Sequence, residues 1–210
     1  MTRPTFHASL SGEMSPPATL TLGFEDAQRL AVADLYWQAF RDKLSLALGP
    51  RQRAVRFLAD ILDPRFAIVA TGEDGRLMGV AGFRTTEGAL IGGALCDITA
   101  HYGRFGALWR SAVLSVMERA PVEGLLQMDG IAVAPWARGV GLGSRLMQAL
   151  AGEARSRALT AIQLDVVDAN TRARALYERL GFRAVGAQHA GIFAPLIGFR
   201  SATTMRWTLG

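Results

Sequence analysis

The sequence predicts an α/β (α+β) fold built on one mixed central sheet, with helices packed on its faces. In the second half of the chain, strand-like segments alternate with segments whose apolar residues recur at helical spacing. In the first half, two apolar runs flank the turn residues 72–75, which is typical of a hairpin. No linker or internal repeat divides the 210 residues, so we expect one domain with a full hydrophobic core.

The first half begins with a proline- and serine-rich stretch at residues 1–17 that lacks sustained periodicity. This composition indicates a flexible leader before a domain that covers residues 18–210. The expected elements that follow are a strand at 19–24, helices at 26–40 and 51–62, and hairpin strands at 66–70 and 77–83. A glycine-rich passage leads to a further helix at 105–117, which Pro121 stops.

The second half has clearer periodicity. The expected elements are strands at 125–133 and 161–167, helices at 141–157 and 170–180, and strands that begin at 182 and 203. Gly181 follows the second of these helices, at the position where a left-handed residue commonly ends a helix.

The loop between the strand at 125–133 and the next helix is the part of the chain best suited to bind a ligand. Its informative residues are Arg138, Gly139, Gly141, Gly143 and Arg145. Glycines let the backbone approach a ligand closely, and loop N–H groups beside a helix N-terminus form a positive concavity suited to phosphate oxygens. The spacing matches neither the G-x-G-x-x-G dinucleotide loop nor the Walker pattern.

Two segments together resemble the GNAT superfamily of acyl-CoA-dependent N-acetyltransferases. Val133-Ala134-Pro135 followed by Arg138-Gly139-Val140-Gly141-Leu142-Gly143 is similar to the family's pyrophosphate loop, Q/R-x-x-G-x-G/A after a strand ending in V-x-P. The segment from Asn170 to Phe182 is similar to the family pattern N-x-x-A-x-x-L-Y-x-x-x-G-F. The resemblance covers about residues 125–185 and implies a mostly antiparallel sheet with one splayed parallel strand pair.

The resemblance also implies roles for individual residues. It assigns cofactor binding to Ile131, Ala132, Val133, Arg138, Gly139, Val140, Gly141, Gly143, Ser144, Asn170 and Tyr177. The loop amides would bind pyrophosphate, and the backbone of the splayed strand would bind the pantetheine arm. Tyr177 would donate a proton to the leaving thiolate, for which a phenol is a plausible acid. Tyr177 could instead only pack on the sheet, and Asn170 could also be the N-cap of its helix.

Asp129 is the first candidate for the general base or the anchor of the acceptor's amine. In a regular strand, Gln127, Asp129, Ile131 and Val133 would share one face, which would be the cofactor face. A bulge in this strand would reverse that parity. The other candidates are Glu87, His101 and Glu123.

The function that these features imply is transfer of an acetyl group from acetyl-CoA to a primary amine, by direct attack in a ternary complex and without a metal. The acceptor could be a small metabolite, an aminoglycoside-like compound, an amino acid or a protein amine. The alternative is a non-catalytic acyl-CoA-binding sensor. The segment at about 85–124 replaces a short turn of minimal family members. It is expected to wall the acceptor site or to form a subunit interface, as in a homodimer.

Composition and charge exclude several other classes of protein. The net charge is +5, but the basic residues are scattered arginines with a single lysine, Lys43, so we expect no nucleic-acid partner. No run of 18 apolar residues or secretory signal is present, so no membrane association is expected. The one cysteine, Cys96, allows no intrachain disulfide, which favours a cytoplasmic location.

Overall fold

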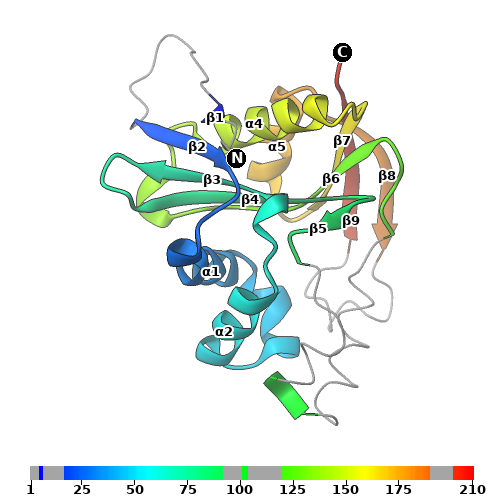
Figure 1. Ribbon diagram of the computed structural model, residues 1–210. Coiled ribbons are helices and arrows are strands. Elements are labelled where there is room, and N and C mark those ends of the chain that lie inside the picture. The colour runs from blue at the N-terminus through cyan, green and yellow to red at the C-terminus, as the bar shows by residue number, and fades with distance from the viewer. Residues whose placement is uncertain (1–4, 7–16, 92–100, 104–119, 190–200) are drawn as a thin grey trace.

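The computed structural model describes residues 5–6, 17–91, 101–103, 120–189 and 201–210. Within these residues nine strands form one sheet in the order β1-β2-β3-β4-β6-β7-β9-β8, with β5 beside β4 (Figure 1). The strands are β1 (Thr5–Phe6), β2 (Ala18–Leu22), β3 (Ala67–Gly72), β4 (Leu77–Thr85), β5 (Gly88–Ala89), β6 (Leu125–Val133), β7 (Ala161–Val167), β8 (Arg183–His189) and β9 (Ser201–Thr208). Among the described strands every pair is antiparallel except β6 with β7, which confirms the predicted mixed sheet.

Helices cover both faces of the sheet. They are α1 (Arg29–Leu48), α2 (Arg51–Ile61), α4 (Leu142–Ser156) and α5 (Thr171–Arg179). Figure 1 shows α1 and α2 on one side of the sheet and α4 and α5 on the other. None of these helices is long and apolar enough to cross a membrane.

The first helix is longer than predicted. The expected end at residue 40 was wrong, because α1 continues to Leu48. Leu44 and Leu48 are 7 % and 1 % exposed, so the buried side of the helix extends two turns further before Gly49 ends it.

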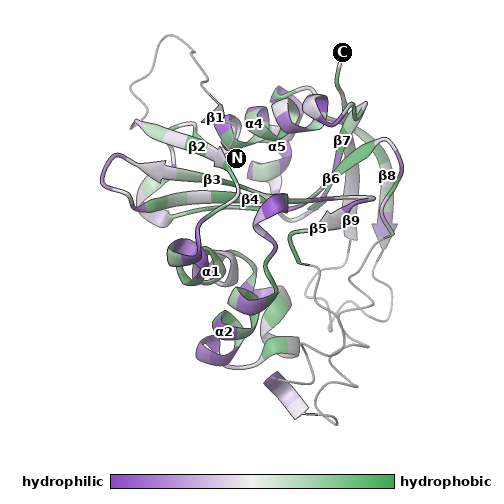
Figure 2. Cartoon of the chain, viewed as in Figure 1, coloured by the Kyte–Doolittle hydropathy of each residue, from purple (hydrophilic) through white to green (hydrophobic). Residues whose placement is uncertain are grey.

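The hydrophobic core lies between the sheet and the helices on each face. Leu146 and Leu150 of α4 and Val32 of α1 are completely buried. Figure 2 shows hydrophobic residues along the central strands, while hydrophilic residues are common on α2 and in the turn between β3 and β4. This distribution follows from the helical spacing of apolar residues and the burial of the central strands.

The only parallel strand pair of the described sheet is short. β6 and β7 pair at Leu125↔Ala161, Leu126↔Ile162 and Gln127↔Gln163. Beyond these pairs, β6 stays with β4 as far as Val133, and β7 stays with β9 as far as Val167. The two strands therefore separate towards their carboxyl ends, which agrees with the predicted splay.

Two predicted segments lie mostly outside the described residues. Within the predicted leader, β1 pairs with β2, while residues 1–4 and 7–16 are not described. The helix predicted at 105–117 is not described. One helical turn of the 85–124 segment, residues 101–103, contacts α1 and α2. There the Tyr102 hydroxyl donates to the Leu48 carbonyl oxygen at 2.8 Å, and His101 Nε2 lies 2.8 Å from Asp60 Oδ2.

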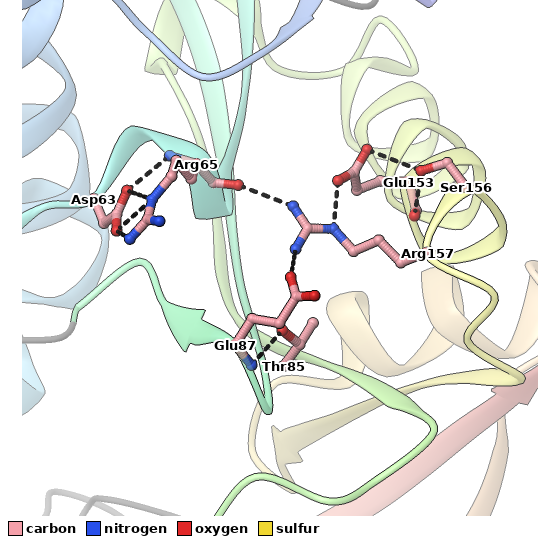
Figure 3. Close-up of polar contacts among 7 residues, drawn as sticks. All are labelled: Asp63, Arg65, Thr85, Glu87, Glu153, Ser156 and Arg157. Carbon is pink, nitrogen blue, oxygen red and sulfur yellow. Dashed lines mark hydrogen bonds and ion pairs between the residues drawn. The ribbon is translucent and has the colours of Figure 1, made fainter.

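Arg157, at the C-cap of α4, joins three parts of the chain (Figure 3). Its Nε donates to Glu153 Oε1 at 2.6 Å, and its Nη1 lies 2.8 Å from Glu87 Oε2. Its Nη2 donates to the Arg65 carbonyl oxygen at 3.3 Å, and its guanidinium lies over the Phe66 ring. The Glu153 side chain is only 5 % exposed, so Arg157 balances a buried charge as well as linking α4 to the strands.

Candidate active site

The loop between β6 and α4 has the geometry of an anion-binding helix N-terminus. After the turn at Pro135–Ala137, Gly139 and Gly141 have φ angles of +84° and +77°, and Gly141 is the N-cap of α4. Such positive φ angles favour glycine. Gly141 has no side chain that could cap the helix, so the first-turn N–H groups keep no acceptor inside α4 until Arg145 bonds to the Gly141 carbonyl oxygen. These groups and the helix dipole suit a phosphate.

The two arginines beside this loop differ in their contacts. Arg138 is exposed, and its Nε donates to the Val133 carbonyl oxygen at 3.1 Å. Arg145 instead donates from Nη2 to the Ala18 carbonyl oxygen at 2.6 Å, which fastens α4 to β2. Arg138 therefore places its positive charge at the exposed end of β6, whereas Arg145 links α4 to β2.

The backbone of β6 alternates between its two neighbouring strands. The Ala134 N–H donates to the Met78 carbonyl oxygen at 2.8 Å, so the backbone of Ala134 bonds to β4. Because every second residue of an antiparallel strand bonds to the same neighbour, the backbone of Ala132 also bonds to β4. The N–H and C=O groups of Ile131 and Val133 must then point the other way, towards β7, where the two strands have already separated. Ile131 and Val133 thus have the geometry expected for binding an extended ligand, whereas the backbone of Ala132 is used in the sheet.

Helix α5 begins at the same edge of the sheet as α4, because each helix follows a strand of the parallel pair. Asn170 Oδ1 accepts from the Ala173 N–H at 3.1 Å, so Asn170 is the N-cap of α5. Tyr177 is 5 % exposed and its ring packs 5.6 Å from that of Phe182. Burial raises the pKa of the Tyr177 phenol to about 12, so this group keeps its proton at neutral pH.

Asp129 lies in a β-bulge of β6. Gly82 pairs with Gly130 and Phe83 pairs with Met128, so Asp129 has no partner of its own on β4. A Cβ on Gly130 would lie 2.3 Å from the Phe40 ring, so this bulge is packed directly under α1. The buried phenol of Tyr36, also on α1, has its pKa raised first by burial and then by the charge of Asp129.

The predicted common face of Asp129, Ile131 and Val133 was wrong because of this bulge. A Cβ on Gly79 would lie 3.0 Å from Leu146 of α4, and Gly79 pairs with Val133. Paired residues point to the same face, so Val133 and Ile131 face α4 while Asp129 lies near α1.

The environment of Asp129 is buried and asymmetric. Arg84 Nε donates to Asp129 Oδ1 at 2.5 Å. The Arg84 side chain is 18 % exposed and the Asp129 side chain is 8 % exposed. Oδ2 is buried and has no hydrogen-bond partner among the described residues. Burial raises the pKa of Asp129, and the opposing effect of Arg84 does not cancel this increase. A carboxylate with a raised pKa and one open oxygen is chemically suited to accept a proton.

The alternative base candidates have other surroundings. Glu87 pairs with Arg157, His101 pairs with Asp60 beside α2, and Glu123 is exposed ahead of β6. Sequence reasoning missed Arg84 of β4, which forms an ion pair with Asp129, and Tyr36 of α1, whose pKa the charge of Asp129 raises. The bulge and these two long-range relationships leave no local signal in the sequence.

Comparisons with known proteins identify the family. Residues 29–182 match the model of the acetyltransferase (GNAT) family. A GCN5-related N-acetyltransferase from Kribbella flavida has a similar fold, with 20 % identity and a TM-score of 0.58 over 91 % of this chain and 98 % of that one. A phosphinothricin acetyltransferase from Sinorhizobium meliloti, solved in complex with AcCoA, has 18 % identity and a TM-score of 0.58, covering 92 % of this chain and 89 % of that one.

The ribosomal-protein-S18-alanine N-acetyltransferase from Escherichia coli is also similar, with 17 % identity and a TM-score of 0.53 over 92 % of this chain and 95 % of that one. At these identities the structural matches establish the fold, and the family model establishes membership. The chain belongs to the acetyltransferase (GNAT) family and is an acyltransferase of that family.

Proposed function

We propose that this protein transfers an acetyl group from acetyl-CoA to a primary amine, by direct attack in a ternary complex. The observation that carries the proposal is the juxtaposition of an open helix N-terminus at Gly141 with a parallel strand pair that separates after Gln127. A molecule with a pyrophosphate and an extended amide-containing arm matches both features. The similar fold of the S. meliloti enzyme, solved in complex with AcCoA, supports the choice of co-substrate.

The binding roles follow from the backbone. The pyrophosphate would be held by N–H groups of Gly139, Val140, Gly141, Gly143 and Ser144, with Arg138 nearby. The pantetheine amides would bond to the N–H and C=O groups of Ile131 and to the N–H of Val133, which point towards β7, while the Val133 carbonyl oxygen accepts from Arg138. Asn170 would contact the same arm from the start of α5, while also capping that helix.

The chemistry requires one proton acceptor and one proton donor. The neutral amine of the acceptor attacks the thioester carbonyl carbon, so a C–N bond forms and the C–S bond breaks. Asp129 takes the proton that the amine loses, and Tyr177 gives its proton to the departing thiolate. The backbone N–H groups of the separated β6 segment would stabilise negative charge on the carbonyl oxygen. Asp129 is suited to its role because it is the second residue beyond the last β6–β7 pair.

Two acceptor classes remain within this proposal. The S. meliloti protein is named for a small molecule, phosphinothricin, and the E. coli protein for an alanine of a ribosomal protein. The same fold therefore serves small and macromolecular amines, and we propose a small-molecule or protein amine as the acceptor here. We also expect the protein to act in the cytoplasm, on the basis of its single cysteine.

Calorimetric titration with acetyl-CoA and with CoA tests the first step. We expect Gly141→Ala to weaken binding of both ligands strongly, because a side chain at φ +77° distorts the loop that presents the amides. The matched control is Gly124→Ala at the opposite end of β6. Its φ is +74°, and the nearest atom to an added Cβ is 3.8 Å away. Equal affinity in the two variants would contradict the loop assignment.

A screen of primary amines by thiol release then tests catalysis. An amine that stimulates thiol release, with mass-spectrometric detection of its N-acetyl product, would establish the transfer reaction. Tight CoA binding with no stimulation by small amines or peptides would instead favour an acyl-CoA sensor.

A further inference from the structure

The two carboxylate oxygens of Asp129 have different surroundings. Oδ1 receives a hydrogen bond from Arg84 Nε at 2.5 Å, whereas Oδ2 is buried without a hydrogen-bond partner in the part of the chain that the structure describes. A buried carboxylate oxygen without a donor is unfavourable, and native structures rarely keep one unless a ligand or function requires it. The Asp129 side chain is 8 % exposed, so bulk water does not offset this cost.

The groups around Asp129 explain why its orientation is fixed. Within the described part of the chain, Arg84 of β4 lowers the pKa of Asp129, and Asp129 in turn raises the pKa of the Tyr36 phenol on α1. The rings of Tyr36 and Phe40 lie 4.5 Å apart, and Phe40 packs on Gly130 next to Asp129. Phe40 therefore covers the bulge on the α1 side, and Arg84 is the described residue that donates a hydrogen bond to the carboxylate.

We propose that Arg84 is a positioning residue that holds Asp129 by Oδ1 and reserves Oδ2 for the amine of the acceptor. This inference rests on the proposed acetyl transfer, since it assigns the acceptor's nitrogen to one atom of the site. The acceptor would bind by an N–H group directed at Oδ2, and the same oxygen would take the proton released during attack. Arg84 itself touches neither the acceptor nor the thioester.

Arginine suits this task because its planar guanidinium donates in a fixed direction. A lysine would supply the charge but would not fix the carboxylate plane in the same way. The arginine charge also opposes the protonation that burial of Asp129 favours, so the carboxylate stays available as an acceptor over a wider pH range.

Carbon-13 NMR titration of the aspartate carboxyl groups in the full-length protein tests the proposal without an acceptor. The Asp129 resonance is assigned by its loss in Asp129→Asn. In Arg84→Met, we expect the pKa of Asp129 to rise further, because the arginine that opposes the effect of burial is removed. Arg84→Lys should give a smaller rise in the pKa of Asp129. This variant still tests the proposal if Arg84→Met does not fold. An unchanged pKa in both variants, with the fold intact by circular dichroism, would overturn the inference.

Arg206→Met is the matched control, because Arg206 is an exposed arginine that bonds only to Gln163 among the described residues. It should leave the Asp129 resonance unchanged. As a direct probe of Oδ2, methylammonium should shift the Asp129 resonance of the CoA-saturated protein, whereas tetramethylammonium, which has no N–H group, should not. Equal shifts with both cations, or none with either, would contradict the reservation of Oδ2.

Different results would contradict the acetyl-transfer function and the positioning role of Arg84. Absence of CoA binding in the calorimetric titration would remove the proposed function. Normal CoA binding and amine acetylation, together with an Asp129 that does not respond to Arg84 or to methylammonium, would remove only the role assigned to Arg84.

Discussion

Burial of the Tyr177 phenol raises its pKa, so the side chain keeps the proton that it would donate. Its pKa is raised to about 12, so the group is a phenol rather than a phenolate at neutral pH. We expect Tyr177→Phe to lower kcat by about 10²–10⁴-fold, the usual contribution of a general acid, with little change in CoA affinity. Steady-state thiol release and calorimetry measure the two quantities. A variant with the turnover of the wild type would exclude Tyr177 as the acid.

The pH dependence of the reaction should report Asp129. Because burial raises its pKa, the carboxylate gains a proton, and the protein loses the proposed base, at a higher pH than for an ordinary aspartate. We therefore expect kcat/KM to fall on the acid side as the pH drops through this raised pKa. Asp129→Asn should lower kcat/KM and remove that limb, which a pH–rate profile measures. Persistence of the same limb in Asp129→Asn would assign it to another group.

At this scale, contiguous motifs could be predicted from the sequence and long-range partners could not. Tyr177 and the loop glycines lie in continuous segments, so the resemblance of these segments to the family patterns could assign them roles. The face of Asp129 depends on the register of β4 against β6, where Gly82 and Phe83 skip one residue. Its contact with Arg84 spans 45 positions, which no local pattern specifies.

Among the elements, α4 is held at both ends by arginines. Arg145 fastens its first turn to β2, and Arg157 joins its last residues to the strands through Glu153 and Glu87 (Figure 3). This arrangement keeps α4, whose N-terminus is the proposed phosphate-binding site, in a fixed position on the sheet.

Removal of Arg157 should therefore destabilise the fold. Arg157→Met leaves Glu153 buried without its partner, and we expect a loss of about 3–5 kcal/mol in the free energy of unfolding. Arg174→Met is the control, because Arg174 and Glu178 form a more exposed i,i+4 pair and the expected change is about 0.5 kcal/mol. Urea unfolding followed by circular dichroism measures both. Glu153→Gln should recover part of the loss in the Arg157→Met background.

Element positions followed closely from periodicity, and element ends did so less well. The strand at 125–133 and the strand at 161–167 have the predicted bounds. The end of α1 was missed because Leu44 and Leu48 continue its buried side after Phe40, and only tertiary packing shows where that side stops. The splay between β6 and β7 came from the family resemblance, since strand separation has no signature in the residues themselves.

For the whole molecule, ligand binding and stability should be linked. A ligand that binds only the folded state at 100 times its Kd stabilises it by about 2.7 kcal/mol, which corresponds to a rise of roughly 5–10 °C in Tm for a chain of this size. We expect CoA to produce such a rise in the wild type and a much smaller one in Gly141→Ala. Differential scanning fluorimetry measures both. An equal rise in the two proteins would place CoA away from the loop.

The short contact between β6 and β7 divides the sheet mechanically into two wings. One wing holds β1 to β6 and the other holds β7 to β9. Among the described strands the wings meet at only three paired positions, Leu125 to Gln127 against Ala161 to Gln163. Each wing is extensively paired internally, so twisting motions should concentrate at this seam. A molecule bound between the wings would bridge β6 and β7 as an additional strand would. Its dissociation would increase motion at the seam more than in any other part of the described sheet.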